Sequence, residues 1–372
     1  MPITQAKCGV WVLDDTHKKL QSGYYQYDNS NDPGTLWAWG RGSSGPLGDG
    51  TTIYRSSPVQ VPGTCWTNIS ASGAPFSLAR KIDGTLWSWG NNAYGGVLGV
   101  GDRIHRSSPV QVPGTAWSCI AAAGQRAMAM KTDGTLWSWG NNNAINPVGD
   151  GTVIYRSSPV QIPGTSWVQI GLGRNNSLAR KSDGTLWGWG GNLGSVGDGF
   201  SLARCSPVQI PGDQWSDVSS GTMARKTDGT LWSWGFNTSG VVGDNTSVHR
   251  SSPVQVPGTS WVQINGSSMA RKTDGTIWIW GFNCVGSLGV NDLIHRSSPV
   301  QIPGTSWVDI GNGISVNFAR KSDGTLWGWG SNTYGQLGVG DRIHRSSPVQ
   351  VPGTAWNDVC TSGLHTLARK IV

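Results

Sequence analysis

Glutamate is absent from this chain, and all 21 acidic residues are aspartate. Only 13% of the residues are charged, and phenylalanine and methionine occur five times each. Glutamate, alanine, leucine and methionine favour helices, whereas this chain is rich in glycine, serine, threonine, valine and tryptophan. The composition therefore predicts an all-β protein. Its 22 tryptophans supply the apolar area for a large core, which a disordered chain would lack.

Long apolar runs are also missing. No stretch of 18 apolar residues occurs, so no membrane-spanning helix is predicted. The first residues lack the apolar segment of a secretory signal, so we expect a cytoplasmic protein, or a virion component that leaves its host by lysis. The six cysteines form no CxxC pair and follow no recurrent spacing, which favours buried apolar roles over a zinc site or a disulfide framework.

A block that recurs seven times is the main feature of the chain. Gly-Thr-Leu-Trp-Ala-Trp-Gly begins at Gly34, and near copies follow at spacings of 45 to 50 residues. The copies begin at Gly84, Gly134, Gly184, Gly229, Gly275 and Gly324. Self-similarity at this period indicates a repeat architecture. We therefore expect one repeat domain over residues 32–372, preceded by an extension over residues 1–31 that has the residues for an extra hairpin.

Each repeat has the pattern of four short strands. In one copy they cover residues 158–164, 167–170, 177–181 and 185–189. Asp183-Gly184 is a strong hairpin signal between the last two strands. Trp187 and Trp189 share one face of the last strand and smaller residues occupy the other, so that sheets can stack bulky face against small face. Seven such units predict a seven-bladed β-propeller of four-stranded antiparallel blades.

The two ends of the chain complement each other. The C-terminal Leu367-Ala-Arg-Lys370 segment has no Thr-Leu-Trp-Xaa-Trp strand after it, whereas the N-terminal region supplies an extra one at residues 35–39. Pairing these N- and C-terminal strands in one blade would close the ring and leave no open sheet edge. An open solenoid with capped ends is the alternative.

The net charge of +7 does not by itself indicate a polyanionic partner. Twenty of the 28 lysines and arginines occupy repeat positions, which spreads them in rings. A nucleic-acid binder usually shows a basic stripe or cluster, so we expect no nucleic-acid partner.

No group of residues predicts catalysis. Gly40–Gly45 matches GxGxxG, but Pro46 and another β repeat follow where a dinucleotide site needs a helix. Four histidines share one repeat position, at which Tyr54 and Tyr155 replace them in two copies; they are His105, His249, His295 and His344. Interchange of histidine and tyrosine favours packing or a hydrogen bond over acid–base chemistry. We therefore predict no enzyme activity, no catalytic residues, no cofactor and no metal.

The tryptophans are interpreted as core residues, because 21 of the 22 occupy three fixed repeat positions. Burying one aromatic side chain removes about 150–250 Å² from water, a gross gain of roughly 4–6 kcal/mol. Sugar-stacking platforms are the alternative interpretation. Trp11 alone lies outside the pattern, and we predict that it is a docking residue of the N-terminal extension.

Strand directions separate the loops into two sets. Because antiparallel strands alternate, the first and third connections of each blade lie on one face of the ring, opposite the second connection and the link to the next blade. The second set is nearly constant in sequence, whereas the first set varies. Recognition usually resides in loops on a rigid scaffold, so we predict that the variable set binds a partner, with drift under relaxed selection as the alternative. The expected contact residues are Tyr94, Arg126, Arg174, Asn175, Phe236, Phe282 and Tyr334.

The repeat resembles a known family. Residues 327–338, Trp-Gly-Trp-Gly-Ser-Asn-Thr-Tyr-Gly-Gln-Leu-Gly, are similar to the repeat of the regulator of chromosome condensation (RCC1) propellers. The amino-acid sequences of the copies are similar to those of bacterial and viral members of the family. Gly363–Ala368 carries the family's Gly-Xaa-His-Ser/Thr-Leu-Ala signature, which implies a local hydrogen bond for His365. The resemblance implies a propeller and a protein-binding role. The eukaryotic prototype is an exchange factor for a small GTPase, but its wedge-like insertion and basic N-terminal tail have no counterpart in this sequence.

Three functional hypotheses follow. The first is a non-catalytic structural or protein-binding propeller, in its narrower form a phage or virion surface protein for attachment or decoration. The second is an intracellular regulator of the RCC1 type, either a GTPase exchange factor or a protein inhibitor. The third is a lectin that binds a cell-surface glycan.

Overall fold

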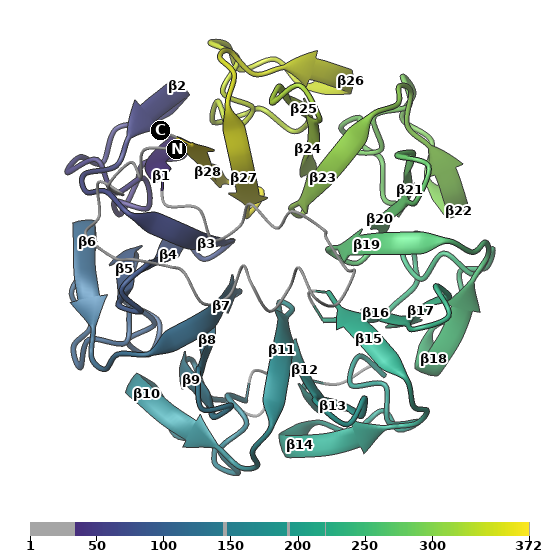
Figure 1. Cartoon of the computed structure of the whole chain (residues 1–372), viewed down its shortest axis with the longest axis horizontal. Coiled ribbons are helices and arrows are strands. Elements are labelled where there is room, and N and C mark those ends of the chain that lie inside the picture. Colours follow the sequence, from purple (N-terminus) through teal and green to yellow (C-terminus); the bar gives the residue numbers. More distant parts are fainter. Residues whose placement is uncertain (1–33, 144–146, 192–193, 220, 372) are drawn as a thin grey trace, which may run out of the picture.

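The structure is a computed structural model that describes residues 34–143, 147–191, 194–219 and 221–371, and it is a closed ring of blades (Figure 1). These residues form 28 strands and contain no α-helix. Five sheets have four strands, and an eight-stranded sheet holds two further blades joined by a single bridge between Gly34 and Trp66. No helix in this part of the chain is long and apolar enough to cross a bilayer. The prediction of a seven-bladed all-β propeller is confirmed.

Each blade runs from the central axis to the rim (Figure 1). The first strands, nearest the axis, are β3 (Trp66–Ser72), β7 (Trp117–Ala123), β11 (Trp167–Leu172), β15 (Trp215–Val218), β19 (Trp261–Asn265), β23 (Trp307–Asn312) and β27 (Trp356–Thr361). The second strands are β4 (Phe76–Lys81), β8 (Arg126–Lys131), β12 (Asn176–Lys181), β16 (Met223–Lys226), β20 (Met269–Lys272), β24 (Val316–Lys321) and β28 (His365–Ile371).

The third strands are β5 (Leu86–Gly90), β9 (Leu136–Gly140), β13 (Leu186–Gly190), β17 (Leu231–Gly235), β21 (Ile277–Gly281), β25 (Leu326–Gly330) and β1 (Gly34–Gly40). The fourth strands, at the rim, are β6 (Arg106–Val112), β10 (Arg156–Ile162), β14 (Arg204–Ile210), β18 (Arg250–Val256), β22 (Arg296–Gln301), β26 (Arg345–Gln350) and β2 (Arg55–Gln60). Each rim strand contains a proline, which edge strands tolerate. Blades 1 to 6 follow in chain order from β3 to β26, and blade 7 combines β27, β28, β1 and β2.

Blade 7 closes the ring with strands from both chain ends. The β1 strand pairs antiparallel with β28 over its whole length, from Gly34 opposite Ile371 to Gly40 opposite His365. Trp39 of β1 also donates a hydrogen bond from Nε1 to the Gln336 carbonyl of blade 6, at 2.8 Å. The predicted pairing of the terminal strands is therefore confirmed.

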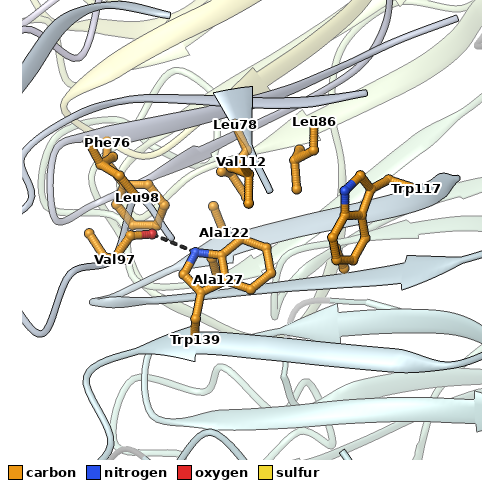
Figure 2. Packing of buried hydrophobic residues seen from close by; sticks show 11 residues of the cluster. Phe76, Leu78, Leu86, Val97, Leu98, Val112, Trp117, Ala122, Ala127 and Trp139 are labelled. Atoms are coloured by element: carbon orange, nitrogen blue, oxygen red, sulfur yellow. Dashed lines mark hydrogen bonds between the residues drawn. The ribbon is translucent and has the colours of Figure 1, made fainter. Parts of the chain in front are cut away.

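The core lies between blades, not inside one. In the cluster drawn in Figure 2, the small face of blade 1 presents Leu86 and Val112, and the bulky face of blade 2 presents Trp117 and Trp139. Equivalent clusters join each other pair of neighbouring blades. The alternation of large and small side chains along each third strand thus produces the stacking that holds the ring together.

One buried indole in each blade also forms a hydrogen bond across the interface. Trp139 Nε1 donates to the Val97 carbonyl of the preceding blade at 2.8 Å (Figure 2). The same contact is made by Trp39, Trp89, Trp189, Trp234, Trp280 and Trp329. Because a buried N–H without a partner is costly, this bond fixes the spacing of neighbouring blades.

A polar contact reinforces the interfaces near the axis. Gln263 Nε2 in blade 5 donates to Asp309 Oδ1 in blade 6 at 2.7 Å, and Arg320 Nε lies 3.9 Å from Asp309 Oδ2. Burial, together with the nearby carboxylate of Asp358 in blade 7, raises the pKa of Asp309 to about 6.

The cysteines follow the prediction only in part. Cys119 is partly buried, and burial raises the pKa of its thiol to about 11, as expected for a small apolar side chain. Cys284 is exposed and Cys65 is disulfide-bonded, so the prediction is wrong at these two positions. Both lie in surface segments, a strand connection and a link between blades, where the core does not enclose the side chain.

Candidate partner-binding face

The loops emerge from two opposite faces, as the antiparallel pairing requires. We call the face with the first-to-second-strand and third-to-fourth-strand loops the variable face. The second-to-third-strand turns and the links between blades form the other face, which we call the constant face.

Residues that recur on the constant face have structural partners. Asp83 Oδ1 accepts hydrogen bonds from the Thr85 backbone N–H and hydroxyl, and Thr85 Oγ1 accepts one from Trp87 Nε1 at 3.0 Å. The Lys81 ammonium lies over the rings of Trp66 and Trp87, at 5.0 and 4.5 Å from their centroids. Blades 2 to 6 repeat both arrangements, which supports the interpretation of the tryptophans as structural.

The variable face is held by hydrogen bonds within its longer loops. Nδ1 of a histidine accepts the backbone N–H of an asparagine in four third-to-fourth-strand loops, for example His344 from Asn332 at 2.9 Å. The other pairs are His105 with Asn92, His249 with Asn237 and His295 with Asn283. An aspartate–arginine ion pair ties the same loop in every blade, such as Asp341 with Arg345 at 2.5 Å. Of the two roles predicted for these histidines, packing or a hydrogen bond, the structure shows the hydrogen bond in all four loops.

His365 is fully buried at the junction of blades 7 and 1. Its Nε2 lies 2.9 Å from Ser77 Oγ, and its Nδ1 lies 3.1 Å from Ser362 Oγ. Burial lowers the pKa of His365 to about 3, so the imidazole is neutral at physiological pH. The contact of His365 with Ser362, three residues earlier in the chain, is the local hydrogen bond that the family signature implies.

Most of the predicted contact residues lie on the variable face. Tyr94, Phe236 and Phe282 are 47%, 53% and 43% exposed, and the two phenylalanines stack on His249 and His295. Arg174 and Asn175 are exposed in the β11–β12 loop of blade 3. The structure distributes these residues around the ring and does not gather them into one patch. Trp11 lies outside the described residues.

Arg126 corrects the prediction, because its side chain is fully buried between blades 2 and 3. Its guanidinium donates hydrogen bonds to Ser177 Oγ and to the carbonyls of Pro147, Gly173 and Asn176, at 2.8–3.1 Å. Burial lowers the pKa of Arg126 to about 9, so that it stays protonated at neutral pH. It cannot contact a partner. It lies opposite the last glycine of its third strand, and the residue in that register is also buried in four other blades.

Tyr334 makes a contact that the sequence did not lead us to expect. Its ring meets that of Tyr54 in the next blade edge to face, with centroids 5.7 Å apart. Tyr54 is one of the two tyrosines that replace histidine in the repeat, and the other is Tyr155. Tyr54 and Tyr155 each follow a blade whose loop carries a tyrosine, Tyr334 or Tyr94, but in the described residues the rings meet only at Tyr54 and Tyr334, so this pattern alone does not indicate the contact.

Comparisons with known proteins agree with this architecture. The Regulator of chromosome condensation (RCC1) repeat profile matches residues 33–79, 83–129, 228–269, 274–319 and 323–369, and a second profile of the same description matches residues 167–193. No curated protein matches the sequence at a significant level.

Several solved structures share the fold. Yeast RCC1 (Prp20) bound to Kap60 has a TM-score of 0.82 at 19% identity, over 94% of this chain and 92% of that one. Prp20p from Saccharomyces cerevisiae, studied for its binding to Gsp1p and histones, gives 0.82 at 18% identity, over 94% and 95%. Human WBSCR16 gives 0.79 at 20% identity, over 91% and 98%. At these identities the likeness establishes the fold alone.

Proposed function

Since this chain belongs to the Regulator of chromosome condensation (RCC1) repeat family, we propose that it is a non-catalytic propeller that binds a protein partner through its variable face. One observation carries the proposal. The sequence varies in the loops of a single face, while the opposite face and the core repeat the same contacts in blade after blade. A fixed scaffold with one divergent face is the arrangement that recognition requires.

The chemistry of the variable face supports a protein as the partner. Tyr94, Phe236 and Phe282 expose aromatic rings from loops that hydrogen bonds and ion pairs hold in place. Aromatic side chains are enriched at the energetic centres of protein interfaces. Loops that are already ordered lose little conformational entropy when they bind, which favours affinity.

Photocrosslinking can test this proposal. A benzophenone amino acid would replace Tyr94 or Phe236 on the variable face, and Val168 on the constant face in the control, where the side chain is 43% exposed. We expect the same protein to be captured from positions 94 and 236 but not from 168. The Tyr94→Ala/Phe236→Ala/Phe282→Ala variant should then lose affinity for that protein by at least tenfold, and Val168→Ala should not. Capture from position 168 alone would contradict the proposal.

Regulation of a small GTPase is a second candidate, supported by the likeness to yeast RCC1 (Prp20). In the described residues every blade has the same four-strand plan, and no wedge-like insertion interrupts it. A fluorescent-nucleotide release assay with purified small GTPases would test this candidate. Release at the intrinsic rate would leave the binding proposal as it stands and remove exchange activity.

A further inference from the structure

We propose that the junction of blades 6 and 7 on the variable face is a docking site for an acidic peptide segment of a protein partner. This inference rests on the proposed function and specifies the chemistry of the partner. The site consists of Arg41, Ile53 and Tyr54 in the β1–β2 loop, and of Tyr334, Arg342 and Ile343 in the β25–β26 loop. We call it the Tyr–Arg site.

Two arginines and two tyrosines from the two blades pack against one another at this junction. The Arg41 guanidinium lies 5.6 Å from the centre of the Tyr334 ring, and that of Arg342 lies 5.9 Å from the centre of the Tyr54 ring. The two rings contact each other edge to face at an interplanar angle of 89°. Each guanidinium is thus positioned by a ring of the other blade, which restricts its motion before any ligand arrives.

The positive charge of the site has no acidic partner in the part of the chain that the structure describes. Asp49 and Asp341 are the only acids in the two loops, and they are bound to Arg55 and Arg345, at 2.8 and 2.5 Å. Among the described residues, the side chain of Arg41 donates one hydrogen bond, from Nε to Ser43 Oγ at 2.7 Å, and its terminal nitrogens have no hydrogen-bond partner there. Guanidinium groups bind carboxylates through paired hydrogen bonds, so a carboxylate is the complementary ligand.

Apolar neighbours favour a peptide over a free anion or a nucleic acid. Ile53 and Ile343 flank the arginines and are 58% and 64% exposed, which gives a ligand apolar surface beside its charges. Stacking of bases would need free ring faces, and a guanidinium lies over one face of each tyrosine here, which reduces the ring surface open to a base. A segment that combines acidic side chains with an apolar one fits both features.

The repeat supplies an internal comparison at the junction of blades 1 and 2. Tyr94, Arg103 and Tyr155 occupy the positions that correspond to Tyr334, Arg342 and Tyr54, but Asn141 stands where blade 7 has Arg41. That junction therefore has one guanidinium group, that of Arg103, where the Tyr–Arg site has two. Arg103 is exposed like Arg342, so substituting either one removes the same charge from equivalent loops.

The test is fluorescence anisotropy with a labelled Gly-Glu-Glu-Leu-Glu-Glu-Gly peptide and the full chain. We expect binding that weakens with salt, a loss of at least tenfold in Arg41→Gln/Arg342→Gln, and a clear loss in Arg342→Gln alone. Arg103→Gln should retain affinity within about twofold. A glutamine version of the peptide should not bind. Melting temperatures of all variants verify that the fold is intact.

Three outcomes would overturn the inference: equal losses in Arg342→Gln and Arg103→Gln, equal binding of the glutamine peptide, or tighter binding of a six-nucleotide oligothymidine. The proposed function has a separate readout in the photocrosslinking experiment. Capture of a protein from positions 94 and 236 combined with any of these outcomes would refute the Tyr–Arg site alone.

Discussion

Arg126 places a positive charge between two blades where its hydrogen-bond partners are three carbonyls and a hydroxyl. Desolvating a guanidinium is costly, and neutral acceptors recover only part of that cost. The side chain nevertheless donates to the buried carbonyls of Pro147 and Gly173, whereas the Asn176 carbonyl also accepts the Gly173 backbone N–H at 2.9 Å. Removing the side chain would take away the cost of burying a charge, but it would also leave buried acceptors without their donor. The net change in the free energy of unfolding can be measured.

We predict that Arg126→Ala lowers the free energy of unfolding by about 2–4 kcal/mol, because it leaves buried acceptors unpaired and a cavity at the interface. Urea or guanidinium denaturation would measure the change. Arg174→Ala, in an exposed loop, serves as the control and should cost less than about 0.5 kcal/mol. Equal effects of the two substitutions would mean that Arg126 does not contribute to the interface as described.

Asp309 should make stability depend on pH. Its pKa rises from the ordinary aspartate value of 3.8 to about 6 in the folded protein, so between these pH values the folded state holds the proton more tightly. Stability at this site is therefore present below about pH 4 and lost as the pH rises through 6. Asp309→Asn should raise the free energy of unfolding by about 1–3 kcal/mol at pH 7.5 and have almost no effect at pH 4. A gain of the same size at both pH values would refute this assignment.

At the scale of elements, the third-to-fourth-strand loop has two roles, one in packing the blades and one in forming the variable face. Toward the core, its glycine packs on the indole of the next blade, and toward solvent it presents the side chains of the variable face. Gly338 in the β25–β26 loop has φ of +72°, and a Cβ there would lie 2.7 Å from Trp39 Nε1. Gly340, two residues later, has φ of +88° and open space where a Cβ would lie.

We predict that Gly338→Ala destabilises the protein by at least about 3 kcal/mol, since it adds a steric conflict with Trp39 to the backbone strain. Gly340→Ala should cost only about 1–2 kcal/mol, because the left-handed backbone alone opposes it. Thermal and chemical denaturation of the pair would separate packing from conformation. If both variants lose the same stability, the contact with Trp39 is not a determinant of the blade interface.

The strands and constant turns could be predicted from the sequence, and the site only in part. Asp183-Gly184 and the alternation around Trp187 fix one hairpin locally, and the repeat copies it. The burial of Arg126 could not be predicted, because a single repeat does not show which residues meet across a blade boundary. The contact between Tyr54 and Tyr334 was missed for the same reason, since its partners come from opposite ends of the sequence.

At the scale of the whole molecule, stability depends on closure as much as on any single blade. The β1 and β28 strands belong to opposite ends of the chain, so their pairing joins segments that are far apart in sequence. Leu36 of blade 7 and Leu86 of blade 1 occupy equivalent positions, and both are fully buried. They stand in the interfaces of blade 7 with blade 1 and of blade 1 with blade 2.

We predict that Leu36→Ala and Leu86→Ala destabilise the protein equally, by about 2–5 kcal/mol each, because both leave a cavity in an equivalent interface. Equilibrium denaturation of the two variants would compare them. Hydrogen exchange should also protect the amides of β28 as strongly as those of β4. A much smaller cost for Leu36→Ala would show that blade 7 opens in solution and that the ring is not closed as described.

The second-strand position opposite the last glycine of the third strand has a consequence for how the chain assembles. Phe76, Arg126, Asn176, Val316 and His365 occupy it in different blades, and each is buried. Near-identical modules in one chain risk docking against the wrong neighbour, or exchanging between two molecules, during folding. A misplaced module would bring the Arg126 guanidinium or the His365 imidazole against a neighbour other than the one that it contacts in the ring. In five of the seven blades, these buried side chains thus favour the native neighbour over an incorrect one.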